Sequence, residues 1–453
     1  MSFAEAYLRK AGLREALIEP EPHSGLLISV TIPVYNESRL ERCLDSLFQC
    51  TFSSSFHAEV LLLINAPADA PAKVLEQNLA TLEACRKWIA DHPHPSMDYF
   101  VWLDHSFRKK EAGVGTARKI LMDEAARRFG MLDRPGGIIA CMDADATVEK
   151  NYLEALIRHF QLTLPGPETK GSQARKTEGT LTESGSNPPD ACSIRFAHPL
   201  KGEEYSEDVY GAIVQYELHL RYYLQSLRST GFPNAYYTVG SSMAVRADIY
   251  CLEGGMNRRQ AGEDFYFIQK LAQRGNYSEC NTTCIIPSPR PSDRVPFGTG
   301  LAVSRLIQDK EVLSTYHPAP FRMLQGLFKQ VETFYNPKSD PESVLKGLPQ
   351  ILVDFLKEQQ FSKALSEIRS NSASIAAFRK RFWRWFHMFR IMKFLHFARE
   401  GGYPDVPVNQ AAAELLKQID PSGEGIPSVG DNALKLLLIY RMLDARGPTL
   451  FPR

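Results

Sequence analysis

The 453-residue sequence lacks any uninterrupted apolar run of the roughly 20 residues that a membrane-spanning helix requires. The N-terminal stretch MSFAEAYLRKAGLREALIEPEP has no continuous apolar core, so we expect no signal peptide and a cytoplasmic protein. An excess of either charge is also lacking, and the net charge of +1 argues against binding of nucleic acid through bulk charge. A hydrophobic share of 44% and a charged share of 23% are ordinary for a soluble globular protein.

The sequence also lacks the two closely spaced pairs of cysteines that are typical of zinc sites. The eight cysteines are scattered along the chain, and without a secretory signal we expect them to be free thiols. Cys280 and Cys284 lie close together but have no second pair, which argues against a zinc site.

The first third of the chain alternates between strand-like and helix-like segments. This pattern predicts an α/β fold with a largely parallel, Rossmann-like sheet of the kind that binds nucleotides. A chain of this length also predicts two domains. We expect strands at 26–37, 58–65, 97–104, 136–145 and 192–200, and helices at 38–50, 73–91, 114–129 and 206–228.

The predicted domains differ in their patterning. We expect a helical extension at 1–24, an α/β domain at 25–305 and an all-helical region at 306–453, because strand signals fade beyond Leu301. Segment 161–190 is rich in Gly, Pro, Ser, Thr and charge, which predicts a mobile insertion loop.

Segment 378–400, FRKRFWRWFHMFRIMKFLHFARE, is strongly aromatic and basic. One interpretation is a helix that lies on an anionic membrane surface, which would make the protein peripheral at the membrane. The other is a packing helix whose Arg and Lys stems cover apolar surface. Apolar residues occur nearly all round the segment, and this favours packing.

Polar side chains end several of the predicted strands, namely Asn36, Asn65, Asp104 and Asp143. Active sites in parallel sheets lie at the carboxyl ends of strands. Asp143 and Asp145 are two positions apart, so on a strand they would share a face and repel each other unless a cation lay between them. The alternative is a solvated acidic turn in front of the next helix.

Four motifs occur in a fixed order: TIPVYNE, GTARK, MDADA and AGEDFYF. Over about residues 26–305 the chain therefore resembles a family-2 glycosyltransferase with the GT-A fold. The D-x-D motif after an apolar strand, with G-E-D far downstream, is the most specific part of the resemblance. It implies an inverting hexosyltransferase that moves a sugar from a nucleotide-sugar donor, most commonly a UDP-sugar, to a carbohydrate-like acceptor.

The resemblance also implies metal ligands. The leaving diphosphate develops negative charge, which a divalent cation neutralises, and Mn²⁺ or Mg²⁺ prefers carboxylate and phosphate oxygens. Asp145 is the implied direct ligand, and Asp143 is implied to contact the ribose or the metal. A histidine often completes the metal site of GT-A enzymes, and His317 is a candidate by its position.

The resemblance implies a general base near the start of the AGEDFYF helix. Inverting family members suggest that Asp264 takes the proton of the acceptor hydroxyl, while Glu263 positions the acceptor or the backbone. The alternative interpretation is that both carboxylates only complement the positive end of the helix dipole.

Further residues are implied to bind the nucleotide sugar. Arg118 matches an arginine that the family places near the nucleotide, although it could instead be a surface residue of an amphipathic helix. Gly240 would let the donor sugar approach the backbone closely. The residues that resemble the lining of the nucleobase and ribose pocket are Pro33, Tyr35 and Glu37.

Two stretches depart from the family pattern. Many members end the second strand in an acidic turn whose aspartate binds the base, whereas this chain has Asn65, which carries no charge. The loop SPRPSDRVPFGTG is also unusual. Arg290 and Arg294 in it could clamp the diphosphate, or the loop could be a Pro-stiffened connector with solvated arginines.

Two other functions remain open. A sugar-phosphate nucleotidyltransferase ordinarily carries a Gly-rich phosphate loop after its first strand, and the corresponding PVYNESRLER has no glycine. A non-catalytic sugar-nucleotide-binding protein on the same fold would not need both carboxylate motifs, but their presence does not exclude it.

Overall fold

The computed structural model describes residues 2–12, 16–108, 112–162, 187–257, 262–292, 298–336, 345–420 and 432–445. Most of the predicted insertion loop at 161–190 therefore lies outside the described residues. The chain forms two compact units. The first unit comprises Met1–Ala197 and Thr238–Ser288, and the second comprises His198–Tyr237 and Pro289–Arg453. The predicted domain boundaries at 24 and 305 stay predictions, and the long helix that we expected at 206–228 belongs to the second unit.

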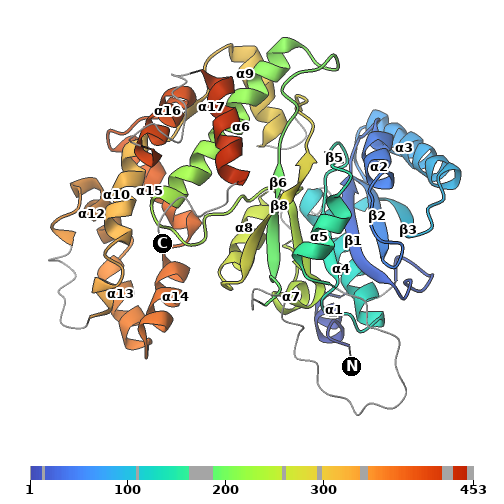
Figure 1. Ribbon diagram of the computed structural model, residues 1–453, viewed down its shortest axis with the longest axis horizontal. Helices are drawn as coiled ribbons and strands as arrows, with labels where there is room; N and C mark the ends of the chain where they lie inside the picture. Colours follow the sequence, from blue (N-terminus) through green and yellow to red (C-terminus); the bar gives the residue numbers. More distant parts are fainter. Residues whose placement is uncertain are drawn as a thin grey trace. The chain divides into compact units, whose positions relative to one another are not determined.

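The first unit is built on one mixed sheet of eight strands, in the order β3-β2-β1-β4-β7-β6-β8-β5 (Figure 1). Neighbours are parallel from β3 to β4 and between β6 and β8, while β7 runs antiparallel to β4 and β6. This confirms the predicted α/β class with a mostly parallel sheet. The strands are β1 Leu26–Val34, β2 His57–Pro67, β3 Met97–Phe107, β4 Ile138–Cys141, β5 Thr147–Val148, β6 Ala191–Phe196, β7 Met243–Arg246 and β8 Tyr277–Ile286.

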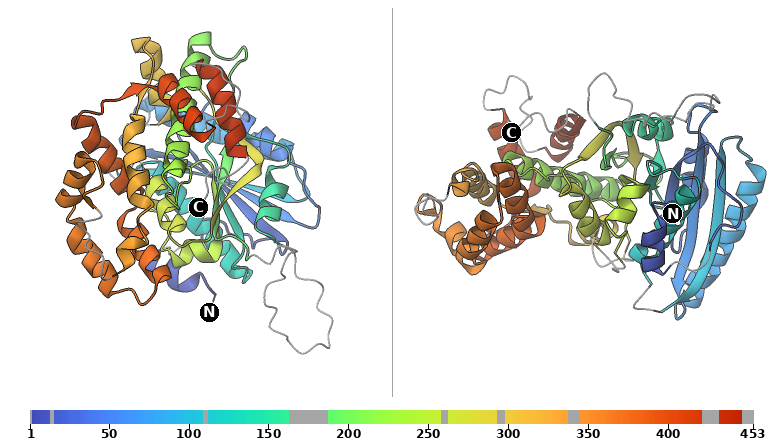
Figure 2. Two further views of the ribbon diagram at one scale, coloured as in Figure 1. Left: turned by 60° about the vertical axis from the view of Figure 1, so that its left-hand side comes forward. Right: turned by 90° about the horizontal axis from the view of Figure 1, so that it is seen from below.

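Helices cover this sheet because its central strands are apolar on both faces. All nine residues of β1 are buried, as is typical of a strand between two helical layers. Figure 2 (right) shows α3 running along the β1–β2–β3 part of the sheet. The helices of the first unit are α1 Glu5–Ala11, α2 Leu40–Phe48, α3 Ala72–Asp91, α4 Val114–Met131, α5 Tyr152–His159, α7 Ala247–Leu252 and α8 Glu263–Ala272.

Pro33 lies in the central strand β1, where a missing N–H would normally break the ladder. The Thr31 carbonyl accepts a hydrogen bond from Met142 N, so Thr31 points toward β4, and Pro33, two residues later, faces the same side. The pairing of β1 with β4 ends at Thr31. No β4 partner is therefore deprived of a donor, and the proline is tolerated.

Helix α4 holds the N-terminal segment onto the first unit. Asp123 accepts hydrogen bonds from the hydroxyls of Tyr7 (2.6 Å) and Tyr250 (2.6 Å) and pairs with Lys119 (2.8 Å), all in the interior. One turn further on, Arg128 donates to the buried Glu59 and to the carbonyl of Pro20. The chain before β1 is thus anchored by buried polar contacts.

Among its described residues, the second unit is helical apart from a ribbon of two short strands, β9 Ser314–Thr315 and β10 Val406–Pro407. This confirms the predicted helical C-terminal region. Figure 1 shows α6 and α17 side by side. The helices are α6 Glu207–Ser229, α9 Thr299–Asp309, α10 Pro318–Phe328, the 3-10 helix η1 Thr333–Tyr335, α12 Gln350–Glu358, α13 Phe361–Ser370, α14 Ile375–Trp385, α15 Met388–Glu400, α16 Val408–Ile419 and α17 Ala433–Ala445.

The aromatic segment 378–400 forms two helices rather than the single helix that we expected. Helix α14 ends at Trp385 and α15 begins at Met388. Phe382 and Phe386 are fully buried, and their rings pack on each other and on the neighbouring Phe328 or Phe361. These aromatic side chains therefore pack against other helices of the second unit. The prediction that the segment lies on a membrane surface is not supported. Within the described residues, no helix has the length and apolar character to cross a membrane.

Candidate functional site

The D-x-D motif lies in a turn directly after β4. The sheet ladder continues one residue past Cys141, where Met142 N donates to Thr31 O (3.1 Å), and the chain then turns so that Ala146 N donates to Asp143 O (3.1 Å). The expected strand at 136–145 is therefore too long, and Asp143 and Asp145 do not share a strand face. The side chain of Asp143 is 44% exposed at the carboxyl end of β4.

Arg118 connects the D-x-D turn to the start of α8. Its side chain is only 3% exposed, so the alternative interpretation as a surface residue is wrong. One guanidinium nitrogen, Nη2, donates to Asp143 Oδ1 (2.9 Å), and the other, Nη1, donates to Glu263 Oε1 (2.6 Å). The positive charge between the D-x-D motif and the carboxylates of α8 is thus supplied by the side chain of Arg118.

Asp264 follows Glu263 in the first turn of α8, after Gly262 in a left-handed conformation. Its two oxygens accept different backbone N–H groups, Oδ2 from Gly240 (2.9 Å) and Oδ1 from Phe265 (2.7 Å). These bonds fix the plane of the carboxylate. Asp264 is thereby held within the same cluster as Arg118, Asp143 and Glu263, which we call the acidic cluster.

Gly240 is required by the acidic cluster itself. A Cβ atom at this position would lie 2.6 Å from Arg118 Nη1 and 2.9 Å from Asp264 Oδ2, distances at which something must shift. Because both atoms belong to groups held by hydrogen bonds or ion pairs, the clash could not be relieved cheaply. The glycine therefore has a packing reason that is independent of the predicted approach of a donor sugar.

Burial and surplus negative charge change the pKa values in the acidic cluster. Burial raises the pKa of both Glu263 and Asp264 above its ordinary value, although the charge of Arg118 opposes the rise. Burial by itself would lower the pKa of Arg118, but the charges of Asp143 and Glu263 outweigh it and the net shift is upward. Arg118 therefore remains a cation, while Asp264 is a stronger base than a free aspartate.

The loop after β1 is fastened to α3 by residues that sequence patterns did not identify. Asn78, fully buried, accepts from Asn36 N (2.9 Å) and donates to the carbonyl of Asn65 (3.3 Å). Thr81, one turn later, donates to the carbonyl of Glu37 (2.6 Å). Both are polar residues on the buried face of a helix, and a polar residue at such a position is the sequence feature that could have identified them.

The predicted nucleobase and ribose residues occupy this same region. Pro33 is buried in β1 and Tyr35 is half-buried just beyond it. Glu37 is almost fully buried, and its Oε1 accepts from Arg39 N (3.0 Å). Asn65 is buried near the end of β2. Their roles in nucleotide binding stay predictions.

Three other predicted residues do not belong to the described part of the first unit. Arg290 and His317 lie in the second unit, and Arg294 lies outside the described residues. His317 caps α10, because its Nδ1 accepts from Ala319 N (3.0 Å). Its ring packs edge-on against Tyr403. The predicted roles of all three in diphosphate or metal binding stay predictions.

The donor set at the D-x-D turn suits one kind of metal site. Throughout the described ranges, no group of three or more His, Cys, Asp or Glu side chains is placed to hold a metal ion. Mg²⁺ and Mn²⁺ that act on nucleotides are often held by only one or two carboxylates, with water and substrate phosphates as the other ligands. Asp143 and Asp145 fit this mode, whereas a closed site made only of protein ligands does not fit.

No protein-family model and no curated protein matches the sequence. Similar solved structures include a 1–349 fragment of TarS from S. aureus in complex with UDP-GlcNAc, at 13% identity over 83% of this chain and 92% of that chain, with a TM-score of 0.36. They also include the mannosyltransferase PcManGT from Pyrobaculum calidifontis in complex with GDP-Man and Mn²⁺, at 14% identity over 98% of this chain and 94% of that chain, with a TM-score of 0.33. Identities and scores this low assign no function to the chain.

Proposed function

We propose that the protein is a nucleotide-sugar-dependent glycosyltransferase, inverting and metal-assisted, that transfers a sugar to a carbohydrate-like acceptor. The observation that supports it most is the acidic cluster, in which buried Arg118 joins Asp143 of the D-x-D turn to Glu263 beside Asp264. Residues far apart in the sequence thereby meet at the carboxyl end of β4, where ligands bind in sheets of this kind.

Asp264 is the proposed general base. Its carboxylate would take the proton of the acceptor hydroxyl as the new bond from that oxygen to the anomeric carbon forms. The bond from the anomeric carbon to the diphosphate oxygen breaks at the same time, and its electron pair leaves with the diphosphate. The raised pKa of Asp264 favours this role, because a base works best when its pKa approaches the working pH.

Arg118 and Glu263 are the proposed positioning residues. The salt bridge from Arg118 to Glu263 (2.6 Å) holds the start of α8, and the bond to Asp143 (2.9 Å) holds the D-x-D turn. Asp145 and Asp143 would hold Mn²⁺ or Mg²⁺, which when bound would neutralise charge on the leaving diphosphate. Because both acidic motifs are held in place before the reaction, their charged groups need to move little when the transition state forms.

The test measures nucleotide release from a panel of UDP-, GDP- and dTDP-sugars, with and without Mn²⁺. We expect release with at least one donor, strong dependence on the metal, and loss of metal-dependent turnover in Asp145→Ala. Asp264→Asn should still bind the donor, as measured by thermal shift, while its rate of sugar transfer falls by about a hundredfold or more. Asp91→Asn, an exposed aspartate at the end of α3, is the control and should behave as the parent protein.

Other outcomes separate the alternatives. Donor binding without release under any condition would favour a non-catalytic sugar-nucleotide-binding protein. Formation of a nucleotide sugar from a sugar phosphate and a nucleoside triphosphate would favour the nucleotidyltransferase. Normal transfer by both Asp145→Ala and Asp264→Asn would overturn the assignment of the acidic cluster.

A further inference from the structure

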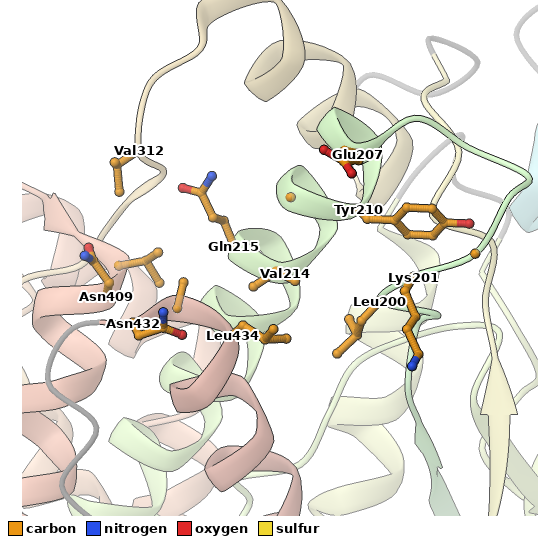
Figure 3. Close-up of a pocket in the computed structure, with 14 residues that line it drawn as sticks. Leu200, Lys201, Glu207, Tyr210, Val214, Gln215, Val312, Asn409, Asn432 and Leu434 are labelled. Carbon is orange, nitrogen blue, oxygen red and sulfur yellow. The ribbon is translucent and has the colours of Figure 1, made fainter.

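A cavity of about 640 Å³ lies beside α6 and the start of α17 in the second unit (Figure 3). Two amides of its lining are already bonded within the protein. Gln215 Oε1 accepts from Leu313 N (2.8 Å), and Asn432 Oδ1 accepts from Lys435 N (3.0 Å). These amide oxygens are therefore not free to select a ligand. In the described part of the first unit, by contrast, side chains at the ends of β2 and β3 leave polar atoms without a partner.

Asn78 joins the ends of three strands, and its partners fix the orientation of its amide. Its Oδ1 accepts from the backbone N–H of Asn36 (2.9 Å), just after β1, so the other amide atom is the nitrogen. This Nδ2 donates to the carbonyl of Asn65 on β2 (3.3 Å) and lies 3.2 Å from Nε2 of His105 on β3. A flipped amide would set nitrogen against an N–H and oxygen against a carbonyl, so only one orientation fits.

The same bonds assign the tautomer of His105. An amide nitrogen is only a donor, so Nε2 of His105 accepts from it and the neutral ring carries its proton on Nδ1. Burial lowers the pKa of His105, against the opposing charge of Asp104, which favours the neutral ring at neutral pH. Nδ1 makes no hydrogen bond to any described residue, and it is not cut off from the surface. His105 therefore presents an unused N–H donor near the end of β3.

Asn65 adds a second unused group beside this donor. It pairs with Asp104 in the ladder of β2 and β3, one position before His105. Asn65 is only 4% exposed, yet within the described residues its side-chain amide makes no hydrogen bond. Asp104 does not supply one, because its Oδ1 accepts from the N–H (2.8 Å) and the hydroxyl (2.6 Å) of Ser106. A ligand can thus bond the amide both as donor and as acceptor.

The order of the strands relates these groups to one end of a nucleotide. The sheet runs β3-β2-β1-β4, and the D-x-D turn follows β4. Neighbouring strands lie about 4.8 Å apart, so β2 and β3 lie about 10 and 14 Å from β4. In a nucleoside diphosphate the base is the end remote from the diphosphate, and its edge carries neutral acceptors and donors. On the proposed glycosyltransferase function, on which this step rests, a diphosphate at the D-x-D turn directs the base toward β2 and β3.

We propose that His105 is a nucleobase-binding residue, which donates its Nδ1–H to a carbonyl oxygen of the donor's base while the amide of Asn65 bonds the neighbouring polar edge. Asn78 is the positioning residue, since it holds the ring by Nε2 and keeps the proton on Nδ1. Uracil, thymine and guanine have such a carbonyl, whereas adenine has none. The donor is therefore a uridine, thymidine or guanosine diphosphate sugar.

Nuclear magnetic resonance of the full chain with nitrogen-15 histidine tests the tautomer without any nucleotide. The ring signals of His105 are those lost in His105→Gln. We expect its proton on Nδ1 in the parent protein. In Asn78→Ala this preference should disappear, because no donor then faces Nε2. A proton on Nε2 in the parent protein overturns the proposal.

Calorimetry of UDP, dTDP and GDP with Mn²⁺ tests the binding role. His105→Gln reaches the Nε2 position but has no donor at Nδ1, so the nucleotide that binds the parent best should bind about tenfold more weakly. His105→Asn is the matched control. Its amide nitrogen lies as many bonds from the backbone as Nδ1 and can donate, so affinity should stay within about threefold of the parent. Pyrophosphate with Mn²⁺, which has no nucleoside, should bind the parent and both variants equally.

Failure of this proposal is distinguishable from failure of the proposed function. Equal nucleotide binding by the parent and His105→Gln overturns the role of His105 and leaves the transferase standing. Equal losses in His105→Gln and His105→Asn overturn it as well, because the donor at Nδ1 then makes no difference. If the parent binds none of the three nucleotides, the proposed function falls, and the role of His105 falls with it.

Discussion

Each unit of the molecule buries an arginine among carboxylates, and the two clusters balance their charges differently. In the acidic cluster, Arg118 is the cation that pairs with Asp143 and Glu263, and Asp264 adds further negative charge beside them. In the second unit, Arg221 and Arg441 both pair with Glu217, and Arg221 also pairs with Asp444. His198 also bonds Glu217, and Gln225 and Tyr237 donate hydrogen bonds to Asp444.

The difference is visible in the pKa values. Burial alone would raise the pKa of Glu217, but Arg221, His198 and Arg441 outweigh it and hold the pKa well below its usual range. The pKa values of Glu263 and Asp264 are raised instead. A buried network with enough cations is a stable structural element, whereas surplus carboxylate marks a place suited to a proton or a metal cation.

The largest expected effect follows from removing one carboxylate charge from each cluster. Glu217→Gln leaves Arg221 and Arg441 short of a buried partner and should lower the free energy of unfolding by about 3–5 kcal/mol. Asp264→Asn removes surplus negative charge but also one acceptor for a backbone N–H, so a change within about 1 kcal/mol is expected. Urea unfolding of both variants measures the contrast.

The control for this pair is Glu414→Gln, which breaks the ion pair of Arg322 with Glu414 on the surface, where both side chains are about half exposed. We expect a change below about 1 kcal/mol. Equal destabilisation by Glu217→Gln and Asp264→Asn would show that charge balance does not separate the two clusters.

A smaller effect is expected when the acidic cluster loses its cation. The charge of Arg118 lowers the pKa of Asp264, so Arg118→Gln should raise that pKa further and move the acid limb of the pH–rate profile to higher pH. Arg118→Lys keeps the charge without the forked geometry, so it should lower the rate and leave the limb near its original position. An acid limb that stays in place in Arg118→Gln contradicts the assignment of Asp264 as the base.

The smallest expected effect is on the pH dependence of stability. Carboxyl groups with raised pKa values bind protons in the folded state at a pH where the unfolded chain has released them, so their contribution to stability falls as pH rises through that window. Replacing both by Glu263→Gln and Asp264→Asn should remove this contribution. Urea unfolding from about pH 4 to pH 7 should then show a steeper rise of stability with pH, or a shallower fall, than in the parent protein.

The low pKa of Glu217 acts with the opposite sign. Its contribution is fully present above the pKa of the unfolded chain and is lost as pH falls through the lower pKa of the folded state. The loss therefore begins as pH falls below about 4.3, the ordinary pKa of a glutamate in the unfolded chain, and continues toward the lower pKa of the folded state. Glu217→Gln should therefore lose less stability than the parent protein between about pH 5 and pH 2, and an equal loss in the two proteins would contradict this sign.

Much of the first unit could be predicted from sequence because its periodicity is strong. The continuous apolar runs that became β1 and β2, and the helix expected at 38–50 that became α2, all lie where the pattern indicated. Strand β8 was not predicted, because YSECNTTCII mixes polar and apolar residues on both faces. The break between α14 and α15 was missed since aromatic residues on every side conceal the end of a helix.

The residue types of the acidic cluster could be predicted, but their geometry could not. Motif order singled out Asp143, Arg118, Glu263 and Asp264. The turn at Asp143 and the bridging position of Arg118 depend on contacts between segments far apart in the chain, which no local pattern encodes.

Helix α4 connects the N-terminus of the chain to the acidic cluster. Arg118 lies in its second turn, and the next residues inward, Lys119, Asp123 and Arg128, hold Tyr7 and Pro20. Proteolytic removal of the chain up to Pro20 would leave buried charges on α4 without those partners and loosen the helix that carries Arg118. Truncation at a terminus remote from the motifs in sequence would therefore disturb the acidic cluster through α4.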